Sequence, residues 1–298
     1  MAHTHSHPHT ADFGKAFAVG IVLNILYVIV EAAFGFMINS MALIADAGHN
    51  LSDVLGLILA WGAAYLAKTS PTQNRTYGLR KSTILAAFLN ALLLLIAVGA
   101  ITIEAIRKFI TPQPVEGSVM MIVAGVGVVI NTITALLFIK GKERDINIKG
   151  AFLHMAADAG VSLGVVAAGL IITFTNILWL DPLVSLLIVV VITIGTWGLL
   201  RDSFLLSMDA VPSNIKTDEI RNYLFSLPGV KDVHDLHIWG MSTTETALTV
   251  HLVIPEHIND DKFLSRVCCE LHDRFDIEHP TIQIETCAQS ASCNSDKV

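Results

Sequence analysis

Two pairs of ionisable residues share one spacing and lie in otherwise apolar parts of the chain. His49 precedes Asp53 by four residues, and His154 precedes Asp158 by four residues. On a helix this spacing places both side chains of a pair on one face, a turn apart. If the two faces meet, two imidazoles and two carboxylates surround one point, which suits a tetrahedral ion such as Zn²⁺. The two carboxylates would also neutralise the double charge of that ion.

The alternative interpretation is that each histidine is a hydrogen-bonded packing residue. Two matching His-x-x-x-Asp pairs favour the metal site over that interpretation, because ionisable side chains in hydrocarbon are costly and usually serve a purpose. The same ligands accept Cd²⁺ and Co²⁺, so the pattern does not define one metal.

Three other acidic residues in apolar segments have less specific patterns. Asp46 lies three residues before His49, so we expect its carboxylate to accept the second N–H of that imidazole. Asp181 precedes Pro182, which predicts a cap for the helix that starts there. Glu31 is interpreted either as a helix-contact residue or as part of a transport pathway.

The composition indicates that most of these residues lie in a membrane. The chain of 298 residues is 53% hydrophobic and 15% charged, whereas a soluble domain carries about 25% charged residues. This excludes a purely soluble enzyme, a nucleic-acid binder and a disordered scaffold. Each spanning helix needs about 20 residues, and six apolar segments are long enough: 13–37, 41–67, 82–106, 118–139, 151–174 and 183–206. Lipid offers no partner for backbone amides, so each segment must be a helix.

The basic residues between these segments predict the orientation of the chain. Ten lysines and arginines fall on the side that also holds the two termini, and only Arg107 and Lys108 fall on the other side. Because positive residues collect on the cytoplasmic side, both termini are expected there. No cleavable signal peptide is expected before the first segment. The short loops favour a bacterial inner membrane.

The net charge of −7 is unevenly distributed. Residues 1–208 hold 12 basic and 11 acidic residues, while residues 209–298 hold 7 and 15. The sequence therefore predicts a histidine-bearing tail over 1–12, a six-helix membrane domain over 13–208 and an acidic cytoplasmic domain over 209–298.

The last domain is expected to be a small α+β layer. Helices are predicted over 214–226 and 260–275, and strands over 230–239, 246–254 and 281–286, which gives the order αββαβ. It contains six of the twelve histidines and all four cysteines. This enrichment indicates metal binding, and the cytoplasmic location argues against structural disulfides. His237, three residues after His234, would face the other side of a regular strand and is expected to stabilise the fold.

The first residues include His3, His5, His7 and His9 at alternate positions. Such a tail captures metal by its composition alone. It could deliver ions to the membrane domain or complete a site on a partner subunit.

At its ionisable motifs the sequence resembles the cation diffusion facilitator family of metal transporters. The matching strings are Ala45-Asp-Ala-Gly-His-Asn-Leu-Ser-Asp53, Tyr77-Gly-Leu-Arg-Lys81, Ala86-Ala-Phe-Leu-Asn90, His154-Met-Ala-Ala-Asp158 and Val233-His-Asp-Leu-His-Ile-Trp239. The resemblance covers nearly the whole chain. It implies a homodimer of six-helix protomers, embedded in the lipid bilayer, that exports divalent metal from the cytoplasm in exchange for protons.

The resemblance also assigns candidate ligands. The family's transport site falls on His49, Asp53, His154 and Asp158, and two histidines with two aspartates imply a zinc-type member. The family's cytoplasmic domain is metallochaperone-like, and its metal site falls on His234, His251 and Glu285, with Cys287 or His279 as the fourth ligand. Zinc is then both the transported and the regulatory ion.

The sequence departs from some relatives in two loops. Residues 68–81 contain no His, Asp, Glu or Cys, so we expect no metal there. Residues 140–149 form a short loop without histidine, where many eukaryotic members have a long histidine-rich one.

Two other functional classes also bind zinc at a membrane. An intramembrane metalloprotease needs a glutamate beside a metal-binding histidine, and none of the twelve histidines is followed by Glu. We therefore expect no enzyme activity. A membrane-anchored metal sensor would bind metal only in the cytoplasmic domain. The expected function is a proton-coupled zinc antiporter that works by alternating access.

Overall fold

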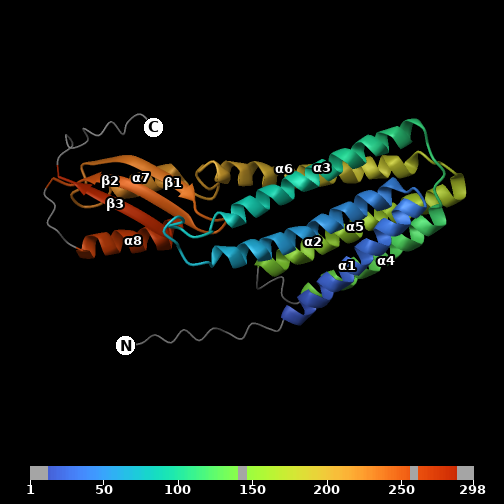
Figure 1. The fold of residues 1–298 in the computed structure, drawn as a ribbon, viewed down its shortest axis with the longest axis horizontal. Helices are drawn as coiled ribbons and strands as arrows, with labels where there is room; N and C mark the ends of the chain where they lie inside the picture. The colour runs from blue at the N-terminus through green and yellow to red at the C-terminus, as the bar shows by residue number, and fades with distance from the viewer. Residues whose placement is uncertain (1–12, 140–145, 256–260, 287–298) are drawn as a thin grey trace. The chain divides into compact units, whose positions relative to one another are not determined.

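The computed structural model describes residues 13–139, 146–255 and 261–286 (Figure 1). Six long helices form its first part: α1 Phe13–Met37, α2 Met41–Ala67, α3 Ser82–Ile110, α4 Gly117–Phe138, α5 Ile146–Thr175 and α6 Leu180–Ser207. Each coincides with one predicted apolar segment, with ends shifted by five residues at most. The predicted histidine-bearing tail lies outside the described residues.

Five of these helices contain stretches that are long and apolar enough to cross a membrane: Met41–Ala67, Ser82–Ile110, Gly117–Leu136, Phe152–Thr175 and Leu180–Ser207. The described part of α1 adds a shorter apolar stretch, Val22–Met37. Large apolar side chains cover the outer surfaces of the helices, with Trp61 75% exposed and Phe174 80% exposed. An outer surface of this kind suits contact with lipid.

Glycines let α4 approach two of its neighbours. A Cβ atom at Gly117 would lie 2.6 Å from the carbonyl oxygen of Gly169, so the backbones of α4 and α5 touch there. Gly127 leaves room for the Tyr27 hydroxyl of α1 in the same way. Small residues allow such close packing of helices in membranes.

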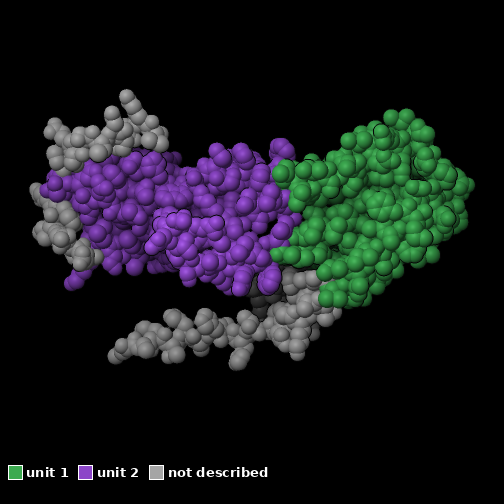
Figure 2. Space-filling view, viewed as in Figure 1, with its two compact units in different colours: residues 1–58, 92–196 green, residues 59–91, 197–298 purple. Residues whose placement is uncertain are grey.

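The chain forms two compact units (Figure 2). One unit holds residues 1–58 and 92–196, and the other holds residues 59–91 and 197–298. The boundary passes through α2, α3 and α6, so the membrane helices are divided between the units.

After α6 the elements are α7 Thr217–Phe225, β1 Asp232–Gly240, β2 Thr246–Val253, α8 Asp261–Phe275 and β3 His279–Glu285. The predicted order αββαβ is confirmed. The strands form one sheet in the order β1-β2-β3, with β1 antiparallel and β3 parallel to β2. A parallel pair needs a crossover connection, and α8 provides it.

The two faces of this sheet differ in character. Leu248, Val250 and Leu252 of β2 pack into a core with Leu224 of α7 and Leu271 of α8. Successive side chains of a strand point to opposite faces, so the intervening residues of β2 face away from that core. The polar face is therefore the one that can carry a site.

Candidate metal centres

Helices α2 and α5 bring the two His-x-x-x-Asp pairs together, in what we call the helical cluster: His49, Asp53, His154 and Asp158. The His49 Nε2 atom lies 3.4 Å from Asp158 Oδ1 and 3.8 Å from Asp53 Oδ2. His154 Nε2 lies 3.2 Å from Asp53 Oδ2 and 3.7 Å from Asp158 Oδ2. Each imidazole therefore faces both carboxylates. The two pairs meet, as the sequence predicted.

These separations match the edges of a small coordination tetrahedron. Zinc binds imidazole nitrogen and carboxylate oxygen at about 2.0–2.2 Å, which places neighbouring ligand atoms about 3.3–3.6 Å apart. The four nitrogen–oxygen distances of 3.2–3.8 Å lie within about 0.2 Å of this range. One ligand atom each from Asp53, His154 and Asp158 also lies within 4.8 Å of the other two.

The carboxylates of the helical cluster have oxygens with unused bonding capacity. Asp158 is 2% exposed, and Asp53 is 28% exposed. The Oδ2 atoms of both are buried without a hydrogen-bond partner in the described part of the chain. Buried anionic oxygens are costly unless they are paired, so a divalent cation would stabilise this arrangement.

The structure contradicts the expected contact between Asp46 and His49. The Asp46 Oδ2 atom instead accepts a hydrogen bond of 2.9 Å from the Ser162 hydroxyl of α5. His49 Nδ1 is buried and has no partner among the described residues. The Asp46 carboxylate therefore contacts the neighbouring helix α5 and not His49 of its own helix α2.

Asp181 also has a partner other than the one predicted. It lies inside the first turn of α6, and its carboxylate accepts hydrogen bonds from Ser40 Oγ at 2.6 Å and from the backbone amides of Met41 and Ala42 at 2.7 and 3.1 Å. Those amides start α2 and have no partner within the helix. Asp181 therefore caps α2 and not its own helix, and the prediction was wrong about which helix is capped.

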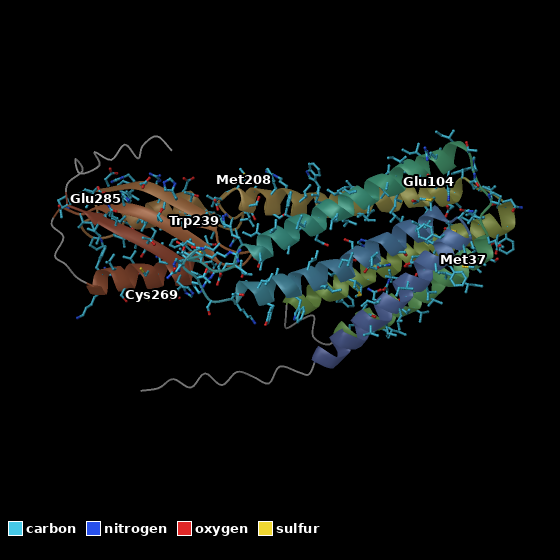
Figure 3. The ribbon with its side chains drawn as sticks, in the orientation of Figure 1. Met37, Glu104, Met208, Trp239, Cys269 and Glu285 are labelled. Carbon is cyan, nitrogen blue, oxygen red and sulfur yellow. The ribbon has the colours of Figure 1, made fainter. Side chains whose placement is uncertain are left out.

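A second group, which we call the sheet cluster, consists of His234 of β1, His251 of β2 and Glu285 of β3. Strand register places His234 opposite His251. Glu285 lies opposite Val253, two residues beyond His251 and therefore on the same face. Figure 3 labels Glu285, the last residue of β3. His251 Nδ1 lies 2.8 Å from Glu285 Oε1, and His234 Nε2 lies 3.2 Å from Glu285 Oε2. The predicted trio thus shares one position, with one ligand atom from each residue within 4.8 Å of the others.

The two histidines control the ionisation of Glu285. Burial raises the pKa of this carboxyl, but hydrogen bonds from His234 and His251 outweigh burial and leave the pKa below its ordinary value. Glu285 is therefore an ionised, anionic ligand under ordinary conditions.

Asp235 belongs beside this cluster, although sequence reasoning did not select it. A β-bulge separates His234 from His237, and Asp235 within it has a φ of +52°. Its carboxylate lies 3.5 Å from His251 Nε2 and 2.8 Å from His237 Nε2. Because the bulge adds one residue to β1, His237 lies on the same face of the sheet as His234. The prediction that His237 faces the opposite side was therefore wrong. In the sequence, Asp235 could have been selected only because it directly follows the candidate ligand His234.

The two candidates for a fourth ligand have different outcomes. His279 begins β3, six residues before Glu285, which corresponds to about 20 Å along a strand. Its ring contacts Tyr77 at a centroid distance of 5.7 Å. His279 therefore does not complete the sheet cluster, and that alternative was wrong. Cys287 lies outside the described residues and stays a prediction.

Comparisons with known proteins assign both parts of the chain. Residues 17–206 match the family described as the cation efflux transmembrane domain, which is more than half of the chain. The chain belongs to the cation diffusion facilitator family of cation efflux proteins. Residues 212–287 match this family's cytoplasmic domain.

Three family members illustrate the similarity. The cation efflux system protein CzcD of Alcaligenes sp. (strain CT14) is 36% identical over 96% of this chain and 90% of its own length. The zinc transporter ZitB of Escherichia coli (strain K12) is 36% identical over 96% and 93%. The cadmium, cobalt and zinc/H(+)-K(+) antiporter of Bacillus subtilis (strain 168) is 32% identical over 95% and 92%.

Membership of the cation diffusion facilitator family settles the class of function. The protein is a multi-pass membrane transporter for metal cations and not an enzyme. The helical cluster lies within the range that matches the family's transmembrane domain, and the sheet cluster lies within the range that matches its cytoplasmic domain. The fold predicted from sequence, membrane helices followed by an α+β domain, is confirmed.

Proposed function

We propose that the protein exports Zn²⁺ from the cytoplasm in exchange for protons, with His49, Asp53, His154 and Asp158 as the transport site. The observation that carries this proposal is the set of imidazole–carboxylate distances of 3.2–3.8 Å between α2 and α5. Two neutral imidazoles and two carboxylates give the bound ion four ligands and a neutral total charge.

Proton exchange follows from the chemistry of the ligands. Zinc needs deprotonated ligands, so protons compete with it for the site. Imidazole titrates near pH 6.5, and small changes of environment move it across the physiological range. When the site faces the cytoplasm, neutral His49 and His154 hold the ion. When it faces the outside at lower pH, protonation of either ring expels the ion, and the protonated site returns inward.

The relatives support a cation-for-cation exchange and a zinc cargo. The Bacillus subtilis relative is named as an antiporter that uses H⁺ and K⁺, and the Escherichia coli relative is named as a zinc transporter. We propose Zn²⁺ as the main cargo. Cd²⁺ and Co²⁺ accept the same ligands and are proposed as weaker cargoes.

The sheet cluster is proposed as a regulatory zinc site. His234, His251 and Glu285 supply three ligands, and Cys287 supplies the fourth. Asp235 would hold the Nε2–H of His251, which leaves Nδ1 free for the metal. The family's cytoplasmic domain supports a homodimer, and zinc at this site would tighten that dimer and raise the transport rate.

The proposed topology follows the positive residues of the loops. Both termini, including the tail 1–12 and the domain 209–298, are placed in the cytoplasm. The named relatives are bacterial, so the proposed membrane is a bacterial inner membrane.

Zinc flux into proteoliposomes with an imposed pH gradient tests this function. We expect gradient-dependent flux in the wild type, its loss in Asp53→Ala and Asp158→Ala, and its persistence in the matched control Glu104→Gln. Glu104 is a half-exposed carboxyl of α3 that pairs with Arg107. Flux that survives both aspartate variants would refute the transport site, whereas zinc binding without any flux would favour a sensor. A panel of Zn²⁺, Cd²⁺ and Co²⁺ in the same assay ranks the cargoes.

A further inference from the structure

A second set of buried polar side chains lies beside the helical cluster and is not part of it. Glu31 of α1 and Asp46 and Asn50 of α2 are each fully buried, with 0% exposure, as is Ser162 of α5. Tyr27 of α1, at 3% exposure, completes the set. We call these five residues the α1 polar group.

The carboxyl of Glu31 accepts hydrogen bonds from two neutral donors. The Tyr27 hydroxyl donates to Glu31 Oε1 at 2.6 Å, and the Asn50 amide donates to Glu31 Oε2 at 3.5 Å. Asp46, the second carboxyl of the group, accepts from the Ser162 hydroxyl at 2.9 Å. No salt bridge within the described part of the chain involves Glu31 or Asp46.

Among the described residues, the titratable groups that face these carboxyls carry no fixed positive charge. They are Tyr27 and Glu31 on α1, Asp46 and His49 on α2, and Asp158 on α5. Two carboxylates that share a dry site repel each other, and one of them then retains a proton. The Oδ1 atoms of Asp46 and Asn50 are also buried without a partner among the described residues. The α1 polar group therefore has the chemistry of a site for one proton.

The α1 polar group is continuous with the helical cluster along both helices. On α2, Asp46 is three residues before His49, and Asn50 is the next residue after it. On α5, Ser162 lies four residues after Asp158, which is one turn further along the same face. A divalent ion in the helical cluster would thus bring positive charge within about a turn of Glu31's partners, and buried charges interact over such distances with little screening.

We propose that Glu31 is a second proton-binding site, distinct from the metal ligands, which releases its proton when zinc binds and regains one when zinc leaves. In this step the O–H bond of the Glu31 carboxyl breaks and the proton passes to water. The carboxylate that remains is stabilised by Tyr27, by Asn50 and by the nearby ion. The inference rests on the proposed function, because only a metal in the helical cluster drives the release.

The number of protons released per zinc bound tests this directly. Purified protein in weakly buffered detergent solution is titrated with Zn²⁺, and a pH indicator counts the protons. We expect Glu31→Gln to bind zinc several-fold more weakly, because in the wild type the coupled release of the Glu31 proton favours zinc binding. The variant should also release up to one proton fewer per zinc and lose most of its gradient-driven flux. The control Glu104→Gln should match the wild type in all three measurements.

Each other outcome contradicts the inference in a recognisable way. If Glu31→Gln releases as many protons per zinc as the wild type, the role of Glu31 is refuted. The proposed function still holds in that case, provided that the wild type shows gradient-dependent flux. Loss of zinc binding in Glu31→Gln would make Glu31 a structural or ligand residue. If wild-type protein neither releases protons nor transports zinc, the proposed function itself fails.

A second variant covers the case in which Glu31→Gln does not fold. Tyr27→Phe removes the hydroxyl that donates at 2.6 Å but keeps the ring beside Gly127. Without that donor the carboxylate is less stable, so proton release should occur at higher pH, with an upward shift in the midpoint of flux against pH. A midpoint that stays at the wild-type value would refute the role of Glu31.

Discussion

The helical cluster and the sheet cluster both join histidines to carboxylates, but their separations differ. In the helical cluster all four imidazole–carboxylate distances lie between 3.2 and 3.8 Å. In the sheet cluster His251 Nδ1 is 2.8 Å from Glu285 Oε1, and the Gln283 amide donates to the same oxygen at 3.1 Å. The first spacing suits an ion between the groups, and the second is that of hydrogen bonds.

The shorter distances of the sheet cluster mean that zinc would bind the two clusters in different ways. Zinc in the sheet cluster would have to displace the proton between His251 and Glu285, and the Glu285 carboxylate and the Cys287 thiolate would then offset its charge. Zinc in the helical cluster meets two carboxylates whose Oδ2 atoms have no hydrogen-bond partner in the described part of the chain. We therefore expect zinc to bind the cytoplasmic site in competition with the hydrogen bond between His251 and Glu285, and to bind the transport site without such competition.

The largest expected effect is that of Asp158→Ala on transport. This carboxylate is 2% exposed and faces both imidazoles of the helical cluster, so its removal leaves an uncompensated charge on the bound ion. Zinc flux in proteoliposomes should fall by roughly a hundredfold or more. The zinc content of the sheet cluster should not change, and a parallel loss there would show that the two clusters are not independent.

Glu285→Gln should produce the opposite result. This variant removes the anionic ligand of the sheet cluster, so each chain should bind one zinc fewer at equilibrium, while flux under saturating zinc persists. Metal analysis after dialysis measures the first quantity and the proteoliposome assay the second. The control Glu270→Gln alters a carboxyl of α8 that pairs with Arg274 and should change neither. Abolished flux in Glu285→Gln would make the sheet cluster essential rather than regulatory.

Asp235→Asn should weaken the sheet cluster without removing it. The carboxylate lies 3.5 Å from His251 Nε2, and the loss of such an outer partner usually lowers metal affinity roughly 10–100-fold. A competition titration with a zinc chelator gives the affinity, and the number of bound ions should stay the same. Asp273→Asn, which alters an exposed carboxyl of α8, serves as the control. Equal affinities in both variants would remove Asp235 from the site.

The smallest expected effect is a dependence of stability on acid pH. The pKa of Glu285 is lowered in the folded protein, so its ionised form stabilises the fold above the ordinary carboxyl pKa of about 4.3. That contribution is lost as the pH falls through the lowered pKa. In metal-free protein, melting temperatures between pH 3 and 6 should show a shallower acid decline for Glu285→Gln than for the wild type. Parallel curves would contradict the hydrogen-bonded arrangement.

The helical cluster could be predicted because its geometry is local. A spacing of four residues fixes a shared helix face, so His49 with Asp53 and His154 with Asp158 required only that α2 and α5 meet. The sheet cluster depends on strand register and on a bulge at Asp235, neither of which is visible in the spacing of residues. His279 was misplaced because it was assigned by resemblance alone, whereas β3 separates it from Glu285 by six residues.

The acidic residues outside the ligand sets show another limit. Asp181 before Pro182 has the pattern of a helix cap, but a carboxylate at a helix start can equally reach the amides of a neighbouring helix. Asp46 and Ser162 are 116 residues apart, so their hydrogen bond depends on how the helices rotate against each other. Such contacts follow from packing, which a single sequence does not specify.

The cap that Asp181 forms on α2 has a mechanical consequence for transport. Three hydrogen bonds join this one carboxylate to Ser40, Met41 and Ala42, and separating them would strand a buried anion. The start of α2 and the start of α6 should therefore move together as one rigid unit. Any hinge that reorients His49 and Asp53 must then lie elsewhere, either on α2 after Ala42 or in the connections to the other helices.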